Sequence, residues 1–349
     1  MLNPALEVED QTNTVSLVVA LADYAATFRV DNDSAIETAR HCLIDALGGA
    51  FEALRDPECA SLISPLVPGA LMPGGARVPG TSLELDPAQA AFCAALMFCR
   101  SPSRSQWLSQ HGARAGGSFG AILTVADYQG RKAVMEGKSP PKVRDMLGAI
   151  VKSLEIQGLL ACEGDPEWPQ TEGATIRLAR VAATAIATAQ LGGGLGQIVT
   201  ALSYACIDGG MPAGEEEEIE LGRRDWATAE AISRAVRHGC QAMATGSSYL
   251  TALDLRAADL AGKLLGATPT LGKSPEPRKA FGTEMIDRLT AARTPLEVAQ
   301  LAKRFQAAID RYFPTRQAER IKALFAAPER LDDLPVNELL AALVTNGAR

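Results

Sequence analysis

The helical spacing of apolar residues, with alanine and leucine as the recurring types, is the feature that most constrains the fold of this chain. Hydrophobic residues make up 47% of the sequence, but aromatic residues make up only 5%. Strands favour valine, isoleucine, threonine and aromatic residues, so this composition favours closely packed helices. We find no convincing strand pattern. We therefore expect an all-α fold with about a dozen helices, forming a single domain over residues 1–349.

Cap and turn residues predict where the helices begin and end. Prolines and glycines are dense in residues 65–81, which predicts a long irregular loop. Asp86 and Pro87 then predict a helix start, because aspartate caps free amides and proline fits the first turn. Ser34 and Glu37 have the spacing of a capping box and predict an earlier helix start. The helices expected from periodicity are at about 15–30, 34–51, 87–98, 118–134, 141–163, 174–190, 195–207, 225–243, 247–265, 281–293, 295–312, 315–327 and 335–345.

Charge and hydropathy exclude several classes of partner. The net charge is −7 and no basic stripe with interleaved aromatic residues is present, so we expect no nucleic-acid binding. No apolar run reaches the roughly 18 residues that a membrane-spanning helix requires, so we expect no membrane association. Residues 1–14 lack the basic start and apolar block of a secretory signal. We therefore expect a cytoplasmic protein.

The histidines and cysteines form no pattern typical of a metal site. The three histidines are scattered, and the cysteines include no Cys-x-x-Cys pair. Most cysteines fall in apolar helical segments, which indicates reduced core residues. The run Gly192–Gly196 follows no strand, so we interpret it as a turn between helices and not as a phosphate-binding loop. We expect no metal site.

Several short segments, in one order along the chain, resemble a known family. They are Cys42–Gly48, Leu66–Thr81, Leu85–Phe92, Leu154–Gly158, Ser233–Val236, Tyr312–Gln317 and Pro335–Glu338. On these segments the chain resembles the 2-methylcitrate dehydratase (MmgE/PrpD) family. The resemblance implies a helical domain, a smaller α/β lid and a dimer formed through the helical domain. It also implies dehydration of 2-methylcitrate, or decarboxylation of cis-aconitate, without a metal or organic cofactor.

The chain departs from the family pattern where the lid is expected. Residues 256–280 should contain the lid, but they hold only a loop rich in proline, glycine, lysine and threonine. We therefore expect a helical domain like that of the family, with the α/β lid deleted.

The catalytic motif of the family is also changed. Trp107, Leu108 and Gly120 align the motif without gaps. The three polar positions of the first run of the motif are then occupied by Pro102, Arg104 and Ser105, and the second, His-Pro-Ser-Asp-like run becomes Arg114, Ala115, Gly116 and Gly117. A further family histidine falls near Thr175, and the family lysine that precedes Trp226 is replaced by Arg224. We carry over no catalytic residue.

Dehydration beside a carboxylate needs a base for a carbon-bound proton and an acid for the departing hydroxyl. Arginine stays protonated, so Arg104 and Arg114 cannot be that base. His111 is a weak candidate for a replacement base, and a solvated loop histidine is the alternative. Arg104, Arg114 and Arg224 are candidates for binding a polycarboxylate, because the guanidinium group matches carboxylates. The acidic run Glu215–Glu218 opposes this interpretation, and solvated surface charge is the alternative.

These departures predict a non-catalytic relative of the family that acts as an interaction or partner subunit. It would pair with a second copy of itself or with a full-length paralogue. The alternative is a cofactor-free lyase or isomerase that acts on a polycarboxylate such as 2-methylcitrate or cis-aconitate. That enzyme would have a rebuilt site with His111 and the arginines in new roles.

Overall fold

The computed structural model describes residues 18–100, 115–162, 172–208, 221–245 and 295–345, and most of these residues are helical. A helix over residues 18–27 precedes the others. The following elements are α2 (Asp33–Ala53), α3 (Pro57–Leu62), β1 (Ala76–Arg77), β2 (Glu84–Leu85), α4 (Pro87–Cys99), α6 (Ala115–Met135), α7 (Val143–Cys162), α8 (Glu172–Gln190), α9 (Leu195–Ile207), α10 (Leu221–Thr245), α14 (Pro295–Tyr312), α15 (Thr315–Phe325), α16 (Pro328–Asp333) and α17 (Val336–Ala342). The predicted all-α class is confirmed.

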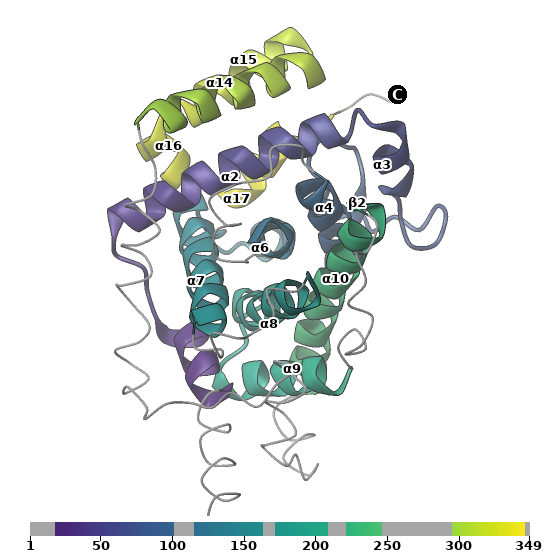
Figure 1. Ribbon diagram of the computed structural model, residues 1–349, viewed down its shortest axis with the longest axis vertical. Coiled ribbons are helices and arrows are strands. Elements are labelled where there is room, and N and C mark those ends of the chain that lie inside the picture. Colours follow the sequence, from purple (N-terminus) through teal and green to yellow (C-terminus); the bar gives the residue numbers. More distant parts are fainter. Residues whose placement is uncertain (1–17, 101–114, 163–171, 209–220, 246–294, 346–349) are drawn as a thin grey trace, which may run out of the picture.

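Two central helices organise the packing. Figure 1 shows α6 and α8 near the middle of the view, with α2 above them, α7 and α10 at the sides and α9 below. Alanine is the commonest buried residue of α8, as at Ala179, Ala182, Ala183 and Ala187. Small side chains allow neighbouring helices to approach closely, which is why an alanine-rich and aromatic-poor sequence can form this core.

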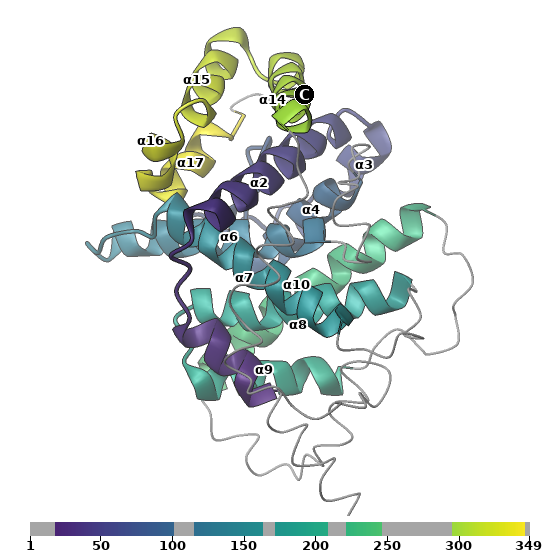
Figure 2. The same cartoon turned by 60° about the vertical axis from the view of Figure 1, so that its left-hand side comes forward.

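The C-terminal helices pack on the same core. Figure 2 shows α14, α15 and α16 at the top, next to α2. Phe51 of α2 packs edge-on against Phe313, with 4.9 Å between ring centroids. The main chain joins the two parts as well, because the Val336 amide donates to the Pro141 carbonyl at 3.0 Å. Arg40 of α2 forms a buried bidentate ion pair with Asp332 at 2.8 Å. Residues 295–342 therefore belong to the same packed body as α2, α6 and α7.

Some helix boundaries follow the prediction and others do not. Asp86 caps α4 as expected, since its side chain accepts from the Ala88 and Gln89 amides. The prediction of a capping box at Ser34 is wrong, because Asn32 is the N-cap of α2 and its side chain accepts from the Ala35 amide. Either side chain can cap a helix, and sequence spacing alone does not choose between them. The expected helices at 247–265 and 281–293, and the predicted lid deletion at 256–280, lie outside the described residues.

The predicted loop contains local order that the sequence pattern did not show. Ala76 and Arg77 of β1 pair antiparallel with Leu85 and Glu84 of β2. Each strand has only two residues, so no alternating pattern could reveal it. The short helices α3 and α16 were not predicted either. The turn predicted at Gly192–Gly196 is confirmed, because α8 ends at Gln190 and α9 begins at Leu195.

Gly120 sets the distance between α4 and α6. A Cβ atom added there would lie 2.5 Å from the Ala95 backbone nitrogen. We expect Gly120→Ala to lower the unfolding free energy by about 1–3 kcal/mol, because the backbone of α4 cannot yield as a flexible side chain could. Urea unfolding followed by circular dichroism measures this change.

Gly148 of α7 provides the control for this substitution. Its added Cβ would approach no atom closer than 3.8 Å, the distance to Val30. Gly148→Ala should therefore raise the unfolding free energy by about 0.5–1 kcal/mol through helix propensity alone. Shifts of the same sign in both variants would contradict the close approach at Gly120.

Candidate functional site

The described part of the altered motif forms the first turn of α6, where three helices converge. Gly117 is buried there between α4 and α10. A Cβ at Gly117 would lie 2.8 Å from Cγ2 of Thr228 and 3.5 Å from Sγ of Cys99. The methyl group of Thr228 therefore fills the space that a side chain at Gly117 would need. This position has no functional group, and a side chain there would require Thr228 to move.

Ser118, the next residue, belongs to a buried polar network between α6 and α7. Ser153 donates its hydroxyl to Ser118 Oγ at 3.0 Å. Gln157 donates its amide to Ser118 Oγ at 3.2 Å and to Ser153 Oγ at 3.3 Å. Buried polar groups are stable only when they are hydrogen-bonded, and these groups bond one another. The network joins two helices and supplies no group with a pKa near neutrality.

Arg224, the described member of the predicted anion-binding set, lies in the first turn of α10. Arg224 is buried and already interacts with other groups of the protein. Its main-chain carbonyl accepts from the Thr228 hydroxyl at 3.0 Å. Trp226 is about half exposed and packs edge-on against Phe92. The other predicted site residues, Arg104, His111 and Arg114, lie outside the described residues.

Thr175, near which the family histidine was expected, is buried in the first turn of α8. Its hydroxyl cannot act as a base near neutral pH. The described first turns of α6, α8 and α10 therefore contribute an arginine, hydroxyl groups and glycines to this region, but no imidazole.

Glu155 of α7 is a buried carboxyl that sequence reasoning did not single out. It is 2% exposed, and neither carboxylate oxygen has a hydrogen-bond partner among the described residues. Burial raises the pKa of Glu155 to about 8, so the group is mostly protonated at neutral pH. Helix geometry places it about 200° around α7 from Ser153, away from the serine network. A glutamate between Leu154 and Ile156 in an apolar stretch was the available signal.

Lys152, one turn before Glu155, has a structural role. Its ammonium donates to the carbonyls of Ala25 and Phe28 at 2.8 and 3.2 Å. These carbonyls lie at the end of the helix over residues 18–27, where cations are favoured. Burial lowers the pKa of Lys152 to about 8.

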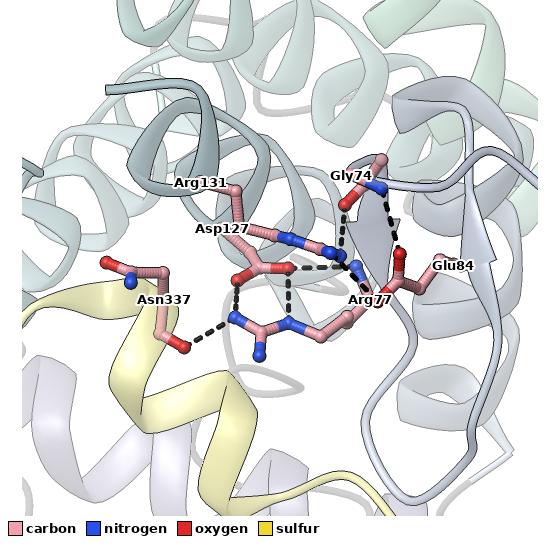
Figure 3. Close-up of polar contacts among 7 residues, drawn as sticks. Gly74, Arg77, Glu84, Asp127, Arg131 and Asn337 are labelled. Carbon is pink, nitrogen blue, oxygen red and sulfur yellow. Dashed lines mark hydrogen bonds and ion pairs between the residues drawn. The ribbon is translucent and has the colours of Figure 1, made fainter. Parts of the chain in front are cut away.

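A second cluster of charged groups lies between the hairpin and α6. Figure 3 shows Arg77 facing Asp127 and, beside them, Arg131 facing Glu84. Asp127 accepts from the Arg77 amide at 2.9 Å and from its Nε at 3.1 Å. The Arg77 guanidinium also donates to the carbonyl of Asn337 in α17. Arg131 further donates to the Gly75 carbonyl at 2.7 Å. Since these groups bind one another, the cluster holds the hairpin, α6 and α17 together.

His238 of α10 also has a structural role. It is buried, and its Nε2 lies 3.2 Å from a carboxylate oxygen of Asp208. Its ring stacks near Tyr204 of α9, with centroids 6.2 Å apart. The pKa of His238 is lowered by burial, with Asp208 opposing that effect.

Among the described residues, no three His, Cys, Asp or Glu side chains are grouped so that they could hold a metal ion. Cys42, Cys59, Cys93, Cys99 and Cys240 are free thiols. No helix in the described ranges is both long and apolar enough to cross a membrane.

A model of the MmgE/PrpD N-terminal domain matches residues 19–255. The chain belongs to the MmgE/PrpD family. It is 36% identical to 2-methylcitrate dehydratase of Escherichia coli (strain K12) over 237 residues, which is 68% of this chain and 49% of that protein. It is 37% identical to 2-methylcitrate dehydratase of Cupriavidus necator over 222 residues, 63% of this chain and 46% of that protein. The chain thus spans about half the length of the curated relatives it matches.

The MmgE/PrpD match covers α2 to α10 and includes the junction of α4, α6 and α10. Helices α14 to α17 lie beyond the match, yet they pack against α2, α6 and α7. The segments Tyr312–Gln317 and Pro335–Glu338, which carried part of the resemblance, lie in these helices.

The closed packing at Gly117 of this MmgE/PrpD protein can be tested by a double-mutant cycle. Gly117→Ala should lower the unfolding free energy by about 1–3 kcal/mol, because the new methyl group overlaps Thr228. Thr228→Ser removes Cγ2 and keeps the hydroxyl bond to the Arg224 carbonyl. In the Thr228→Ser background, Gly117→Ala should lower the unfolding free energy much less. Chemical unfolding of the four proteins should therefore give a coupling energy of about 0.5–3 kcal/mol. Additive effects would show that this junction has free space.

Proposed function

We propose that this MmgE/PrpD protein is a non-catalytic relative of 2-methylcitrate dehydratase that acts as an interaction or partner subunit. The observation that carries the proposal is the packing of Gly117, where a Cβ would lie 2.8 Å from Thr228. The family resemblance assigns a polar residue to this position. The functional group is missing, and the Thr228 methyl group lies where that side chain would begin.

The expected loss of rate is large. A positioned general acid or base contributes about 10²- to 10⁴-fold. Gly116 and Gly117 offer no proton-transfer group, and Arg114 stays protonated at working pH. Losing several such groups removes most of the acceleration that acid–base catalysis gives to dehydration.

Exposed apolar side chains support an interaction role. Leu66, Val67 and Leu71 are exposed on the loop before β1, and Val134 and Met135 are exposed at the end of α6. The Met135 side chain lies next to Gly74 of the same loop. Apolar side chains gathered at a surface are typical of protein–protein contacts.

The catalytic part of the proposal is tested by proton NMR with 2-methylcitrate, citrate and cis-aconitate. We expect no conversion above the rate in buffer, with Escherichia coli 2-methylcitrate dehydratase as the positive control. The His111→Ala variant is assayed in parallel. Turnover by the wild-type chain that is lost in this variant would overturn the proposal.

The partner part of the proposal is tested by light scattering. The chain is measured alone and mixed with a full-length 2-methylcitrate dehydratase, and we expect a homodimer or a mixed complex. Leu66→Ser/Leu71→Ser should weaken that association if the exposed loop contributes to it. A monomer in both samples would remove the partner role.

Glu155 favours one alternative, a cofactor-free lyase or isomerase with a rebuilt site for a polycarboxylate. Burial raises the pKa of this carboxyl to about 8, in the range of a general acid, although its side chain is only 2% exposed. Including Glu155→Gln in the same NMR assay separates the two functions. Turnover that depends on Glu155 would establish the enzyme and exclude the non-catalytic role.

A further inference from the structure

A cavity of about 1270 Å³ lies among α3, the turn between β1 and β2, α15 and the chain after α17. Three arginines, Arg55, Arg316 and Arg320, are among the residues that line it, and none of the lining residues is acidic. The junction of α4, α6 and α10 contributes no lining residue. The cavity, here called the arginine groove, is therefore separate from the candidate site.

The arginines of the groove keep their charge available. Among the described residues none of the three forms an ion pair, whereas nearby carboxylates are bound to other cations. Asp56 and Glu58 pair with Arg100, and Glu52 pairs with Arg311. The lining of the groove therefore carries three positive charges and no negative charge, although the chain carries a net charge of −7.

Helix α15 adds to this potential. Arg316 and Arg320 stand one turn apart on α15, and like charges at this spacing repel each other. The helix begins at Thr315 after Pro314, and no side chain caps its N-terminus. Helix N-termini attract anions through their free amides and dipole. A bound anion would reduce the repulsion between Arg316 and Arg320 and would also accept hydrogen bonds from the free amides of the helix N-terminus.

The wall of the groove is held by hydrogen bonds around Gly80. The Gly80 amide donates to the Leu343 carbonyl at 2.7 Å. The Gly80 carbonyl accepts from the hydroxyls of Tyr312 and Thr345 at 2.7 and 2.8 Å. Gly80 has a φ of +77°, a conformation that side-chain-bearing residues rarely adopt. The groove is thus preorganised, which lowers the entropic cost of binding.

We propose that the arginine groove binds a small molecule with at least two anionic groups, either carboxylates or phosphates. Guanidinium groups match both kinds of anion through paired hydrogen bonds. Leu54, Ile63 and Leu83 also line the groove and would contact an apolar part of the ligand. This proposal does not depend on whether the protein is catalytic.

Isothermal titration calorimetry at low ionic strength tests the proposal, with citrate, pyrophosphate and uncharged glycerol as probes. The test variant is Arg316→Gln/Arg320→Gln. The control, Arg237→Gln/Arg330→Gln, removes the same charge from two exposed arginines that do not line the groove. We expect saturable binding of citrate, pyrophosphate or both, weakened about tenfold or more in the test variant and unchanged in the control. Added salt should weaken binding.

The outcomes separate the possible ligands. Binding of citrate alone supports a carboxylate ligand, and binding of pyrophosphate alone supports a phosphate ligand. Arg316→Lys/Arg320→Lys keeps both positive charges and should retain part of the affinity. Partial binding by this variant would show that the loss in the glutamine variant is not caused by unfolding. Absence of saturable binding for both anions, or an equal loss in the test and control variants, would overturn the proposal.

Discussion

The Asp127→Ala variant is expected to lose about 3–5 kcal/mol of unfolding free energy, because it leaves the guanidinium of Arg77 buried without its partner. Asp127 is fully buried on α6 and accepts both from the Arg77 side chain and from its amide. Burial raises the pKa of Asp127 even though Arg77 opposes that change. Desolvation is therefore the main cost at this pair, and removing one partner leaves that cost uncompensated.

An exposed ion pair provides the control for Asp127→Ala. Asp333 pairs with Lys142 at 2.7 Å, and both side chains are mostly exposed. Asp333→Ala should change the unfolding free energy by no more than about 1 kcal/mol. Both variants are compared by urea unfolding at neutral pH. Similar losses in the two variants would show that the contacts in Figure 3 do not hold the hairpin to α6 and α17.

The Glu155→Gln variant is expected to be more stable than the wild type by roughly 4 kcal/mol at pH 8 and by no more than about 1 kcal/mol at pH 5. In the folded protein burial raises the pKa of Glu155 from 4.5 to about 8. Between these values the folded state holds a proton that the unfolded state has lost. Wild-type stability therefore falls as the pH rises through this window, and glutamine, which mimics the protonated acid, removes the dependence.

The pH range of this experiment must also avoid the values at which the titration of Lys152 changes the unfolding free energy. Burial lowers the pKa of Lys152 from 10.5 to about 8, so its contribution changes with pH only above that value. His238, whose pKa is lowered by burial, also titrates between pH 5 and pH 8, so in thermal unfolding the difference between the wild-type and Glu155→Gln curves is what reports on Glu155. Glu319→Gln, a substitution on the exposed surface of α15, is the control and should not change the pH dependence. Parallel stability curves for the wild type and Glu155→Gln would contradict the raised pKa.

The two largest expected changes in unfolding free energy come from two buried carboxyl groups, Asp127 and Glu155, that differ in their hydrogen-bond partners. Asp127 is matched by the Arg77 side chain and by the Arg77 main-chain amide. Glu155 has no hydrogen-bond partner among the described residues, and it avoids ionisation by keeping its proton. Removing the first charge should destabilise the protein, whereas removing the second should stabilise it.

Local chemistry in the sequence was enough to predict the helical class, the start of α4 at Asp86 and the turn at Gly192–Gly196. Each of these depends on residues within one or two turns of one another, such as an aspartate that caps its own helix. The family was also identified from the sequence, because segments along the chain resemble it in order. The cap of α2 was predicted wrongly, since Ser34 and Asn32 are both suitable caps.

Only the tertiary structure showed what surrounds each residue. No sequence pattern indicated that Thr228 occupies the space beside Gly117, since the two residues lie far apart in the chain. No sequence pattern predicted that Arg55, in the segment after α2, lines the same groove as Arg316 and Arg320 of α15. Helical periodicity determines which face of a helix is apolar. The packing of helices that are distant in sequence determines which side chains are buried. That packing raises the pKa of Glu155 and places the Thr228 methyl group beside Gly117.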